Sequence, residues 1–149
     1  MPKFETWVAI GSLALGIMFV TLILSFYNFL IGPEGNGPQT SVDPFGATVQ
    51  IVSISGAPSL ILAGIAFGTT RSSADHKSAF ILIATGITFI GGMSAARIAY
   101  SKINSSFVIP GLDLVPVLFI LGGIGVAALG GYLLMTSKRA RQNLEDELL

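Results

Sequence analysis

The side chains that could carry acid–base or metal chemistry in this chain are few and scattered. The single histidine, His76, stands between Asp75 and Lys77, and the chain has no cysteine. One imidazole beside one carboxylate falls short of the three or four ligands that zinc or copper sites use, and thiolate sites are excluded. No motif around His76 indicates a Ser–His–Asp assembly. We therefore expect no catalytic residue, no cofactor and no metal site, and interpret His76 as a solvated loop residue.

Two ionisable residues lie at the edge of long apolar segments. Arg97 stands near the end of the third such segment, and Asp113 stands just before the fourth. A charge inside a bilayer is costly, about 2.5–3.5 kcal/mol at a helix centre on insertion scales, so its presence suggests a role. The two residues form a possible outer-interface pair that fastens two helices. Alternatively, Asp113 caps a helix, Arg97 reaches the headgroups, or both contact a substrate or ion.

Recognition motifs for phosphate and nucleic acid are missing. The pattern GxxxxGK[ST] is absent, and the eight basic residues are balanced by eight acidic ones. Because a strong positive excess is the usual footprint of nucleic-acid binding, we expect no nucleic-acid partner. Asn104 opens an Asn-Ser-Ser glycosylation sequon, a pattern that also arises often by chance.

Four long apolar segments dominate the chain and must position these residues. Hydrophobic residues make up 52% of the sequence and charged residues 11%, against about 25% charged residues in soluble domains. A helix needs about 20 apolar residues to cross a bilayer, whereas a membrane β-strand needs only about 10, in alternation. We predict an all-α membrane protein with a single domain over residues 1–149. Its four transmembrane helices span about residues 7–31, 46–68, 78–100 and 114–136, and a tail covers residues 137–149.

The positions of the basic residues predict the orientation in the membrane. Short loops rich in Lys and Arg stay on the cytoplasmic side. Six basic residues fall on one side of the four-span bundle and two on the other: Lys3, Arg71, Lys77, Lys138, Arg139 and Arg141 against Arg97 and Lys102. We therefore expect an N-in/C-in helical bundle in the cell membrane. Trp7 and Tyr132 would then mark the inner interface, and Tyr27 and Tyr100 the outer one.

Small residues at a spacing of four predict where the helices pack, because lipid tails are as apolar as leucine and close backbone approach drives association. The predicted helix-packing residues are Ser12 and Gly16, Gly64 and Gly68, Gly91 and Ala95, and Gly123, Ala127 and Gly131. Gly92 with Ala96 repeats the spacing in the third segment. Pro58 predicts a helix kink in the second segment, unless Ser55 or Ser59 rebuilds the local hydrogen bonding.

The tail combines basic and acidic residues. Lys138, Arg139 and Arg141 would contact lipid headgroups, worth about 1 kcal/mol each. Leu144 and Leu148 are four apart, which indicates a continuation of the fourth helix. That segment would either dock on a partner or fray in the cytosol.

Scarce chemistry and abundant packing surface favour a non-catalytic accessory subunit of a multi-subunit membrane complex, and not an enzyme. In size and four-span hydropathy, the whole chain resembles the small accessory subunits of energy-converting membrane complexes, including those around archaeal ammonia monooxygenase. The resemblance implies other integral membrane subunits as partners, as in a membrane oxidase or monooxygenase, and transfers no functional residue. The alternative is a small homo-oligomeric transporter or channel, with Gln50, Ser55, Pro58 and Ser59 lining a polar path.

Overall fold

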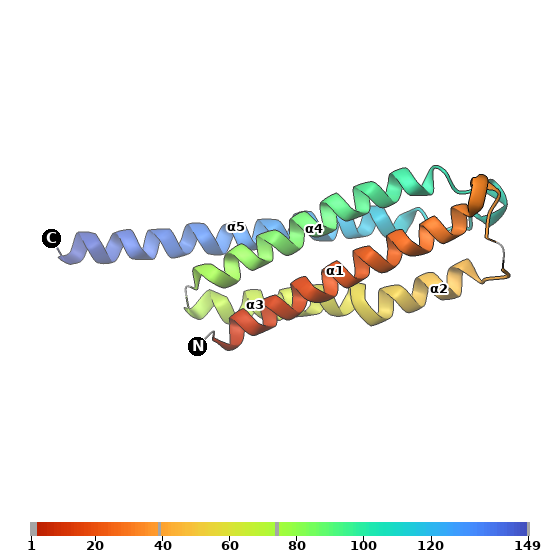
Figure 1. Ribbon diagram of the computed structural model, residues 1–149. Helices are drawn as coiled ribbons and strands as arrows, with labels where there is room; N and C mark the ends of the chain where they lie inside the picture. The colour runs from red at the N-terminus through yellow and green to blue at the C-terminus, as the bar shows by residue number, and fades with distance from the viewer. Residues whose placement is uncertain (1–2, 39, 74, 149) are drawn as a thin grey trace.

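Four long helices run side by side along the molecule (Figure 1). The computed structural model describes residues 3–38, 40–73 and 75–148. The first span is α1 (Phe4–Ile31); the second consists of α2 (Pro44–Ile51), a π-helical turn η2 (Val52–Gly56) and α3 (Ala57–Ser73); the third is α4 (His76–Tyr100) and the fourth α5 (Leu114–Leu148). Two short 3₁₀ turns, η1 (Pro33–Gly35) and η3 (Ser105–Phe107), lie in the connections. All four spans are long and apolar enough to cross a membrane, which confirms the predicted all-α fold.

Local capping explains where the helices begin and end. The Asp43 carboxylate accepts a hydrogen bond from the Phe45 amide at 3.2 Å and starts α2, with Pro44 in the first turn. Asp75 starts α4 in the same way, accepting from the Lys77 amide at 3.2 Å. Gly32 ends α1 with φ at 68°, and a Cβ there would collide with the Gly37 carbonyl. Only glycine therefore fits this turn.

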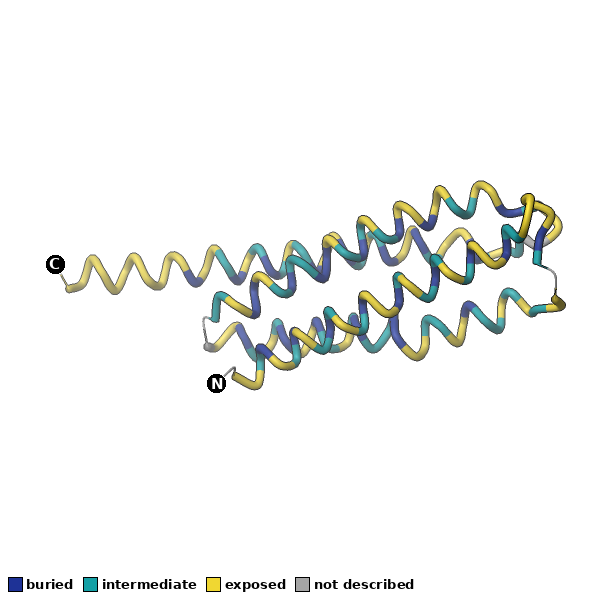
Figure 2. Tube along the Cα trace, in the orientation of Figure 1, coloured by how far each residue is buried: buried dark blue, intermediate teal, exposed yellow. Residues whose placement is uncertain are grey.

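The spans form a bundle in which α1 and α5 each lie between α3 and α4, and α3 also touches α4 across the bundle. α4 packs most extensively against α5 and then against α1, while α3 packs against α1 and against α5. Both chain ends lie at one end of the bundle, which we call the tail end; the connections after α1 and after α4 lie at the opposite, loop end (Figure 1). Buried residues follow the inward faces of the helices, and exposed residues cover the outside (Figure 2).

An aromatic cluster joins three spans in the core. Phe19 of α1 lies 4.2 Å from Phe119 of α5 and 5.9 Å from Phe89 of α4, and Phe89 lies 5.6 Å from Phe119, measured between ring centroids. The π-helical turn closes this cluster from the fourth side. A Cβ on Gly56 would come within 2.8 Å of the Phe119 ring and 2.9 Å of the Phe19 ring. Glycine at this position therefore lets the second span approach the cluster.

The second span stays helical past Pro58 because its backbone bonding changes just before the proline. Over Val52–Gly56 the helix is π-helical, and the Ala57 amide donates to the Val52 carbonyl five residues back. Ser55 donates its hydroxyl to the Ile51 carbonyl at 2.8 Å. Such π adjustments compensate for the amide that proline lacks. Of the two predicted outcomes, a kink at Pro58 or rebuilt local bonding, the wide turn before the proline with the Ser55 hydrogen bond corresponds to the second.

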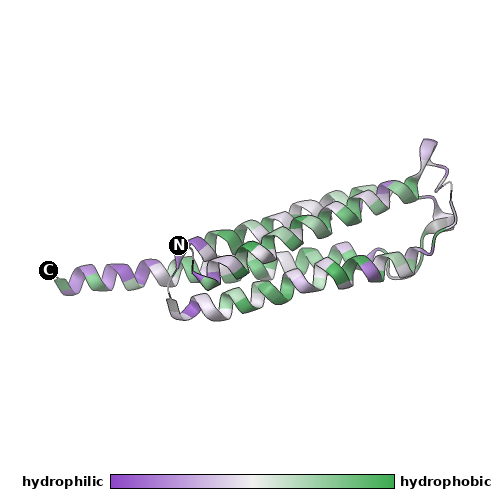
Figure 3. Ribbon diagram, turned by 60° about the horizontal axis from the view of Figure 1, so that its bottom comes forward, coloured by the Kyte–Doolittle hydropathy of each residue, from purple (hydrophilic) through white to green (hydrophobic). Residues whose placement is uncertain are grey.

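The fourth helix is longer than its membrane span. α5 continues without a break to Leu148 and projects beyond the tail end of the bundle (Figure 1). Hydropathy colouring shows apolar residues along all four spans and hydrophilic residues concentrated on this projection (Figure 3). The prediction that Leu144 and Leu148 continue the fourth helix is therefore confirmed.

Candidate functional site: the exposed faces of the bundle

Two of the predicted packing residues join α1 to the second span. Ser12 donates its hydroxyl to the Ser59 carbonyl at 2.8 Å, and Ser59 donates to the Ser12 carbonyl at 2.7 Å. Gly16 lies one turn further along α1, where a Cβ would be 3.2 Å from the Ser59 hydroxyl oxygen. This contact is fully used inside the bundle and offers nothing to a partner.

The predicted ridge on α5 does meet another helix, although one of its members is displaced. A Cβ on Gly86 of α4 would lie 2.5 Å from the Gly123 carbonyl and 2.6 Å from the Ala127 Cβ. Further along α5, a Cβ on Gly130 would lie 2.9 Å from the Ala79 carbonyl, whereas Gly131 has nothing within 4 Å. The ridge is therefore Gly123, Ala127 and Gly130. In a helix with 3.6 residues per turn, residues four apart are rotated by about 40° relative to each other. After two such steps Gly131 no longer faces α4, and Gly130 takes its place.

The remaining predicted packing pairs lie on the outside of the bundle. A Cβ on Gly64, Gly68 or Gly91 would meet no atom within 4 Å, and Ala95 is exposed. On α4 the inward position belongs to Gly92, whose Cβ would collide with Val20 of α1. Gly64 with Gly68 on α3, and Gly91 with Ala95 on α4, therefore form two small-residue faces that no helix in the described part of the chain covers. We call them the α3 face and the α4 face.

The half of α1 nearer the loop end presents polar groups on its exposed side. Thr21, Ser25 and Asn28 follow one another at helical spacing, and all three are exposed. Thr21 donates to the Ile17 carbonyl at 2.8 Å. Within the part of the chain that the structure describes, the side chains of Ser25 and Asn28 make no hydrogen bond. Such groups hydrogen-bond across helices when a partner helix is present.

Arg97 and Asp113 do not form the possible outer-interface pair. Both lie at the loop end and are exposed, but the described residues contain no ion pair between them. Asp113 precedes the first residue of α5, and its carboxylate accepts no hydrogen bond from the described first turn. The expected fastening of α4 to α5 is instead provided by the glycine contact at Gly86 and Gly123. Each charge is thus free to face solvent or headgroups.

Tyr27 does not mark a membrane interface. Its ring is fully buried, and its hydroxyl donates to the Leu112 carbonyl in the α4–α5 connection at 2.7 Å. Trp7 and Tyr132, in contrast, are exposed near the tail end, where aromatic side chains prefer the headgroup boundary. A tyrosine near a span end satisfies its hydroxyl equally well with a buried carbonyl.

Polar side chains gather at the tail end around the start of α4. The Asp75 carboxylate accepts hydrogen bonds from the Thr6 hydroxyl at 2.8 Å and the Ser78 hydroxyl at 3.0 Å. Burial raises the pKa of Asp75, but these bonds and those from the Lys77 and Ser78 amides outweigh it, so the pKa lies below its usual value. Thr6 thereby ties the start of α1 to the start of α4.

His76 lies in a helix and contacts α5, so its interpretation as a solvated loop residue is wrong. It is the first residue of α4 and is half-buried. The Ser137 hydroxyl lies 3.0 Å from its Nε2 and 3.2 Å from its Nδ1. Among the described residues no three His, Asp or Glu side chains converge on a metal-sized site. The imidazole therefore connects α4 to α5 where α5 leaves the bundle.

The residues considered for a polar path do not converge within one chain. The Ser55 and Ser59 hydroxyls are buried and bonded to the Ile51 and Ser12 carbonyls. Gln50 is exposed on the outside of α2. Within the described residues the two serine hydroxyls are thus used in hydrogen bonds to helix carbonyls.

The projecting end of α5 is exposed all round. Lys138, Arg139 and Arg141 lie directly beyond the bundle, where they can reach headgroups. Leu144 is 61% exposed and Leu148 87% exposed. No part of the described chain packs against these two leucines.

Comparisons with protein families, with curated proteins and with solved structures find no match to this chain. The fold alone therefore defines its class, an all-α bundle whose four helices are long and apolar enough to span a membrane.

Proposed function

We propose that this protein is a non-catalytic accessory subunit of a multi-subunit integral membrane complex. The observation that carries the proposal is the division of its small residues. Gly16, Gly86, Gly92, Gly123 and Gly130 serve the interior, whereas the α3 face and the α4 face have open space in front of them. A small-xxx-small face lets a second backbone approach closely, which is the main attraction between helices in lipid.

Polar groups on α1 support the same proposal. Thr21, Ser25 and Asn28 lie on an exposed helix face in a span of high hydropathy. Lipid tails offer no hydrogen-bond partner, whereas a neighbouring subunit helix does. Together with the two small-residue faces, the exposed polar residues of α1 favour a bundle that is surrounded by other subunits.

The proposed setting is the cell membrane, with both termini cytoplasmic. The two chain ends share the tail end of the bundle, and six basic residues belong to that end or its connection, against Arg97 and Lys102 at the loop end. Lys and Arg in short segments are retained in the cytoplasm. The four-span profile is what supports placing the subunit in an energy-converting complex such as a membrane oxidase or monooxygenase.

Purification of the tagged full-length chain from its native membrane in mild detergent tests the proposal. We expect other integral membrane polypeptides at a fixed ratio. Gly64→Leu with Gly68→Leu should reduce their recovery, because leucine holds the helix backbones apart. The matched control is Ile61→Leu with Ile65→Leu, which changes exposed residues of the same helix without adding bulk. The control should keep full recovery.

Two results would overturn this function. One is unchanged recovery of the partner polypeptides when leucine replaces both residues of the α3 face and both residues of the α4 face. The other is a self-contained oligomer that moves a solute across liposomes, which would establish the transporter or channel alternative.

A further inference from the structure

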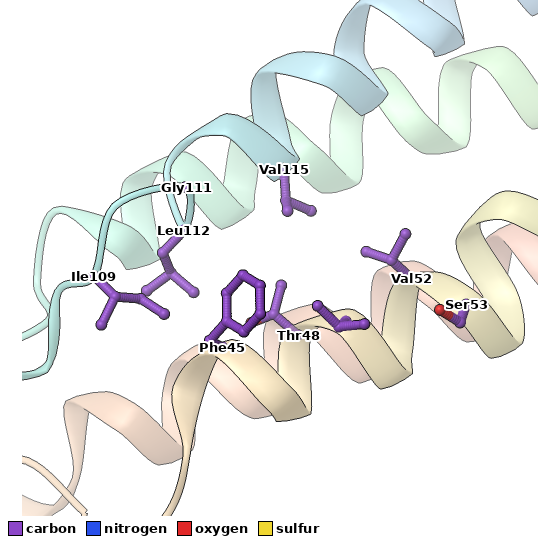
Figure 4. A pocket seen from close by; sticks show the side chains of 9 residues that line it. Phe45, Thr48, Val52, Ser53, Ile109, Gly111, Leu112 and Val115 are labelled. Atoms are coloured by element: carbon purple, nitrogen blue, oxygen red, sulfur yellow. The ribbon is translucent and has the colours of Figure 1, made fainter.

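An apolar groove opens between α2 and the beginning of α5 at the loop end (Figure 4). Its volume is about 230 Å³. One wall comes from the second span and the other from the α4–α5 connection and the first turn of α5. The lining residues are Phe45, Thr48, Val49, Val52 and Ser53 on the first wall, and Ile109, Gly111, Leu112 and Val115 on the second. We call this cavity the α2–α5 groove.

Hydrogen bonds hold both walls in place. Leu112 is buried, and its carbonyl accepts the hydrogen bond of Tyr27 at 2.7 Å. Thr48 donates its hydroxyl to the Pro44 carbonyl at 2.7 Å, so its donor is already used. Val52 and Ser53 begin the π-helical turn, a feature that often accompanies functional sites. The groove is therefore preformed and offers few polar contacts.

Size and depth fit a hydrocarbon chain. An apolar cavity of about 150 Å³ stays dry and takes up benzene, and this groove is larger. It extends from Phe45 to Ser53, about 12 Å along a helix axis, close to the half-thickness of a roughly 30 Å hydrocarbon core. Phe45 is 62% exposed and Val49 46% exposed, so the groove opens sideways to the surroundings of the bundle. At this depth those surroundings are lipid.

The charges near the groove distinguish between lipid classes. No Lys or Arg lines it. Asp43 lies two residues before Phe45, Asp113 follows Leu112, and both carboxylates are exposed at the loop end. Two carboxylates beside the water-facing end favour a headgroup that carries an ammonium group and disfavour a net anionic one.

We infer that the α2–α5 groove binds one acyl chain of a zwitterionic phospholipid, with the headgroup next to Asp43 and Asp113. This site stands apart from the small-residue faces and does not rest on the proposed function. The bound lipid would fill the space between α2 and α5 and thus form part of the structure.

Photolabelling in liposomes tests the site. The full-length chain is reconstituted in phosphatidylcholine with a trace of phosphatidylcholine that carries a diazirine on its acyl chain. Labelled peptides are mapped by mass spectrometry. We expect label in residues 44–53 and 109–115 to exceed label around Ile61 and Ile65 about tenfold, equal to a preference of 1.4 kcal/mol. When part of the unlabelled phosphatidylcholine matrix is replaced by phosphatidylglycerol, labelling of the groove should increase, because phosphatidylglycerol competes less well with the probe.

Filling the groove should abolish the preference. Val115→Phe places a ring in the cavity, and Val52→Phe does so from the other wall, which covers the case in which one variant fails to fold. Leu118→Phe is the matched control on the exposed side of α5. Asp113→Asn should bring phosphatidylglycerol closer to phosphatidylcholine as a competitor.

Three results would overturn the inference. They are uniform labelling of all lipid-facing peptides, labelling of the groove that survives both phenylalanine variants, and labelling that disappears when the chain is studied in an intact complex, since a partner helix would then occupy the groove.

Discussion

Ser12 on α1 and Ser59 on α3 exchange hydrogen bonds in both directions, each hydroxyl donating to the carbonyl of the other at 2.8 and 2.7 Å. The reciprocal pair requires the two backbones to lie close together, which Gly16 next to it allows. It joins spans whose positions in the sequence are 47 residues apart. This contact leads to the first of four predictions about stability.

Replacing either serine by alanine should weaken the bundle modestly. Hydrogen bonds between membrane helices contribute about 0.6 kcal/mol on average and up to about 1.7 kcal/mol. We expect each of Ser12→Ala and Ser59→Ala to lower the free energy of unfolding within that range, measured by denaturant titration in mixed micelles. Thr21→Ala, which removes only a bond within α1, is the control and should cost less. Equal losses at all three positions would contradict the special role of the pair.

Two glycines of α4, only five positions apart, should respond in opposite ways to alanine. Gly86→Ala would push a Cβ to 2.5 Å from the Gly123 carbonyl, so we expect a loss of about 1–3 kcal/mol as α4 and α5 separate. Gly91→Ala meets open space and replaces a poor helix former, so stability should stay the same or rise by up to about 1 kcal/mol. Thermal unfolding in detergent measures both. A destabilised Gly91→Ala would show that the α4 face is packed.

Removal of the Tyr27 hydroxyl should loosen the α4–α5 connection. Tyr27→Phe leaves the Leu112 carbonyl without its donor, at a cost of about 1–3 kcal/mol for a buried acceptor. Hydrogen exchange of the amides in residues 109–114 should become faster. Tyr100→Phe is the control, because its ring packs near Tyr27 and its hydroxyl makes no hydrogen bond in the described chain. Unchanged exchange in Tyr27→Phe would show that other contacts hold the connection.

The carboxyl of Asp75 should make the tail end sensitive to acid. Its folded-state pKa lies below the ordinary value of 3.8 because Thr6, Ser78 and the α4 amides donate to it. A lowered folded pKa means that its stabilisation is complete above pH 3.8 and is lost as the pH falls through the folded pKa. Thr6→Val should move the pKa back up.

Unfolding measurements at a series of pH values test this direction of the pH dependence. The stability difference between the wild-type chain and Thr6→Val should be largest near neutral pH and should shrink as the pH falls below 3.8. Glu5→Gln is the control on the same turn of α1. A difference that stays constant with pH would mean that Thr6 contributes through packing alone.

The four spans could be predicted from the sequence because a bilayer imposes one simple requirement, a long apolar segment without charge. The predicted ends of the helices lie close to the observed ones for the same reason. The exception is α5, because no glycine or proline follows Thr136 and the helix continues to Leu148. The packing was harder. Gly64, Gly68 and Gly91 satisfy the same spacing rule as Gly123, and spacing alone cannot tell which side of a helix faces its own chain.

Other features of the structure depend on three dimensions and had no sequence signal. Gly86 has no small partner at a spacing of four, so its contact with Gly123 could be found only from the neighbouring helix. The sequence indicated an irregularity near Pro58, but the close approach of Gly56 to the rings of Phe19 and Phe119 could be found only from the packed helices. The α2–α5 groove depends on the path of a connection that lies between Tyr100 and Leu114. Length and composition do not determine such paths.

The unbroken course of α5 to Leu148 limits how this chain can associate with itself. Two copies inserted with the same topology would send their α5 projections out on the same side, pointing the same way. Lys138 and Arg139 would then stand beside their own counterparts, and so would Glu145 and Asp146. Like charges at the same height repel each other, so parallel pairing of two copies through the projecting end of α5 is disfavoured. A different protein whose helix carries the charges in the reverse order would be attracted.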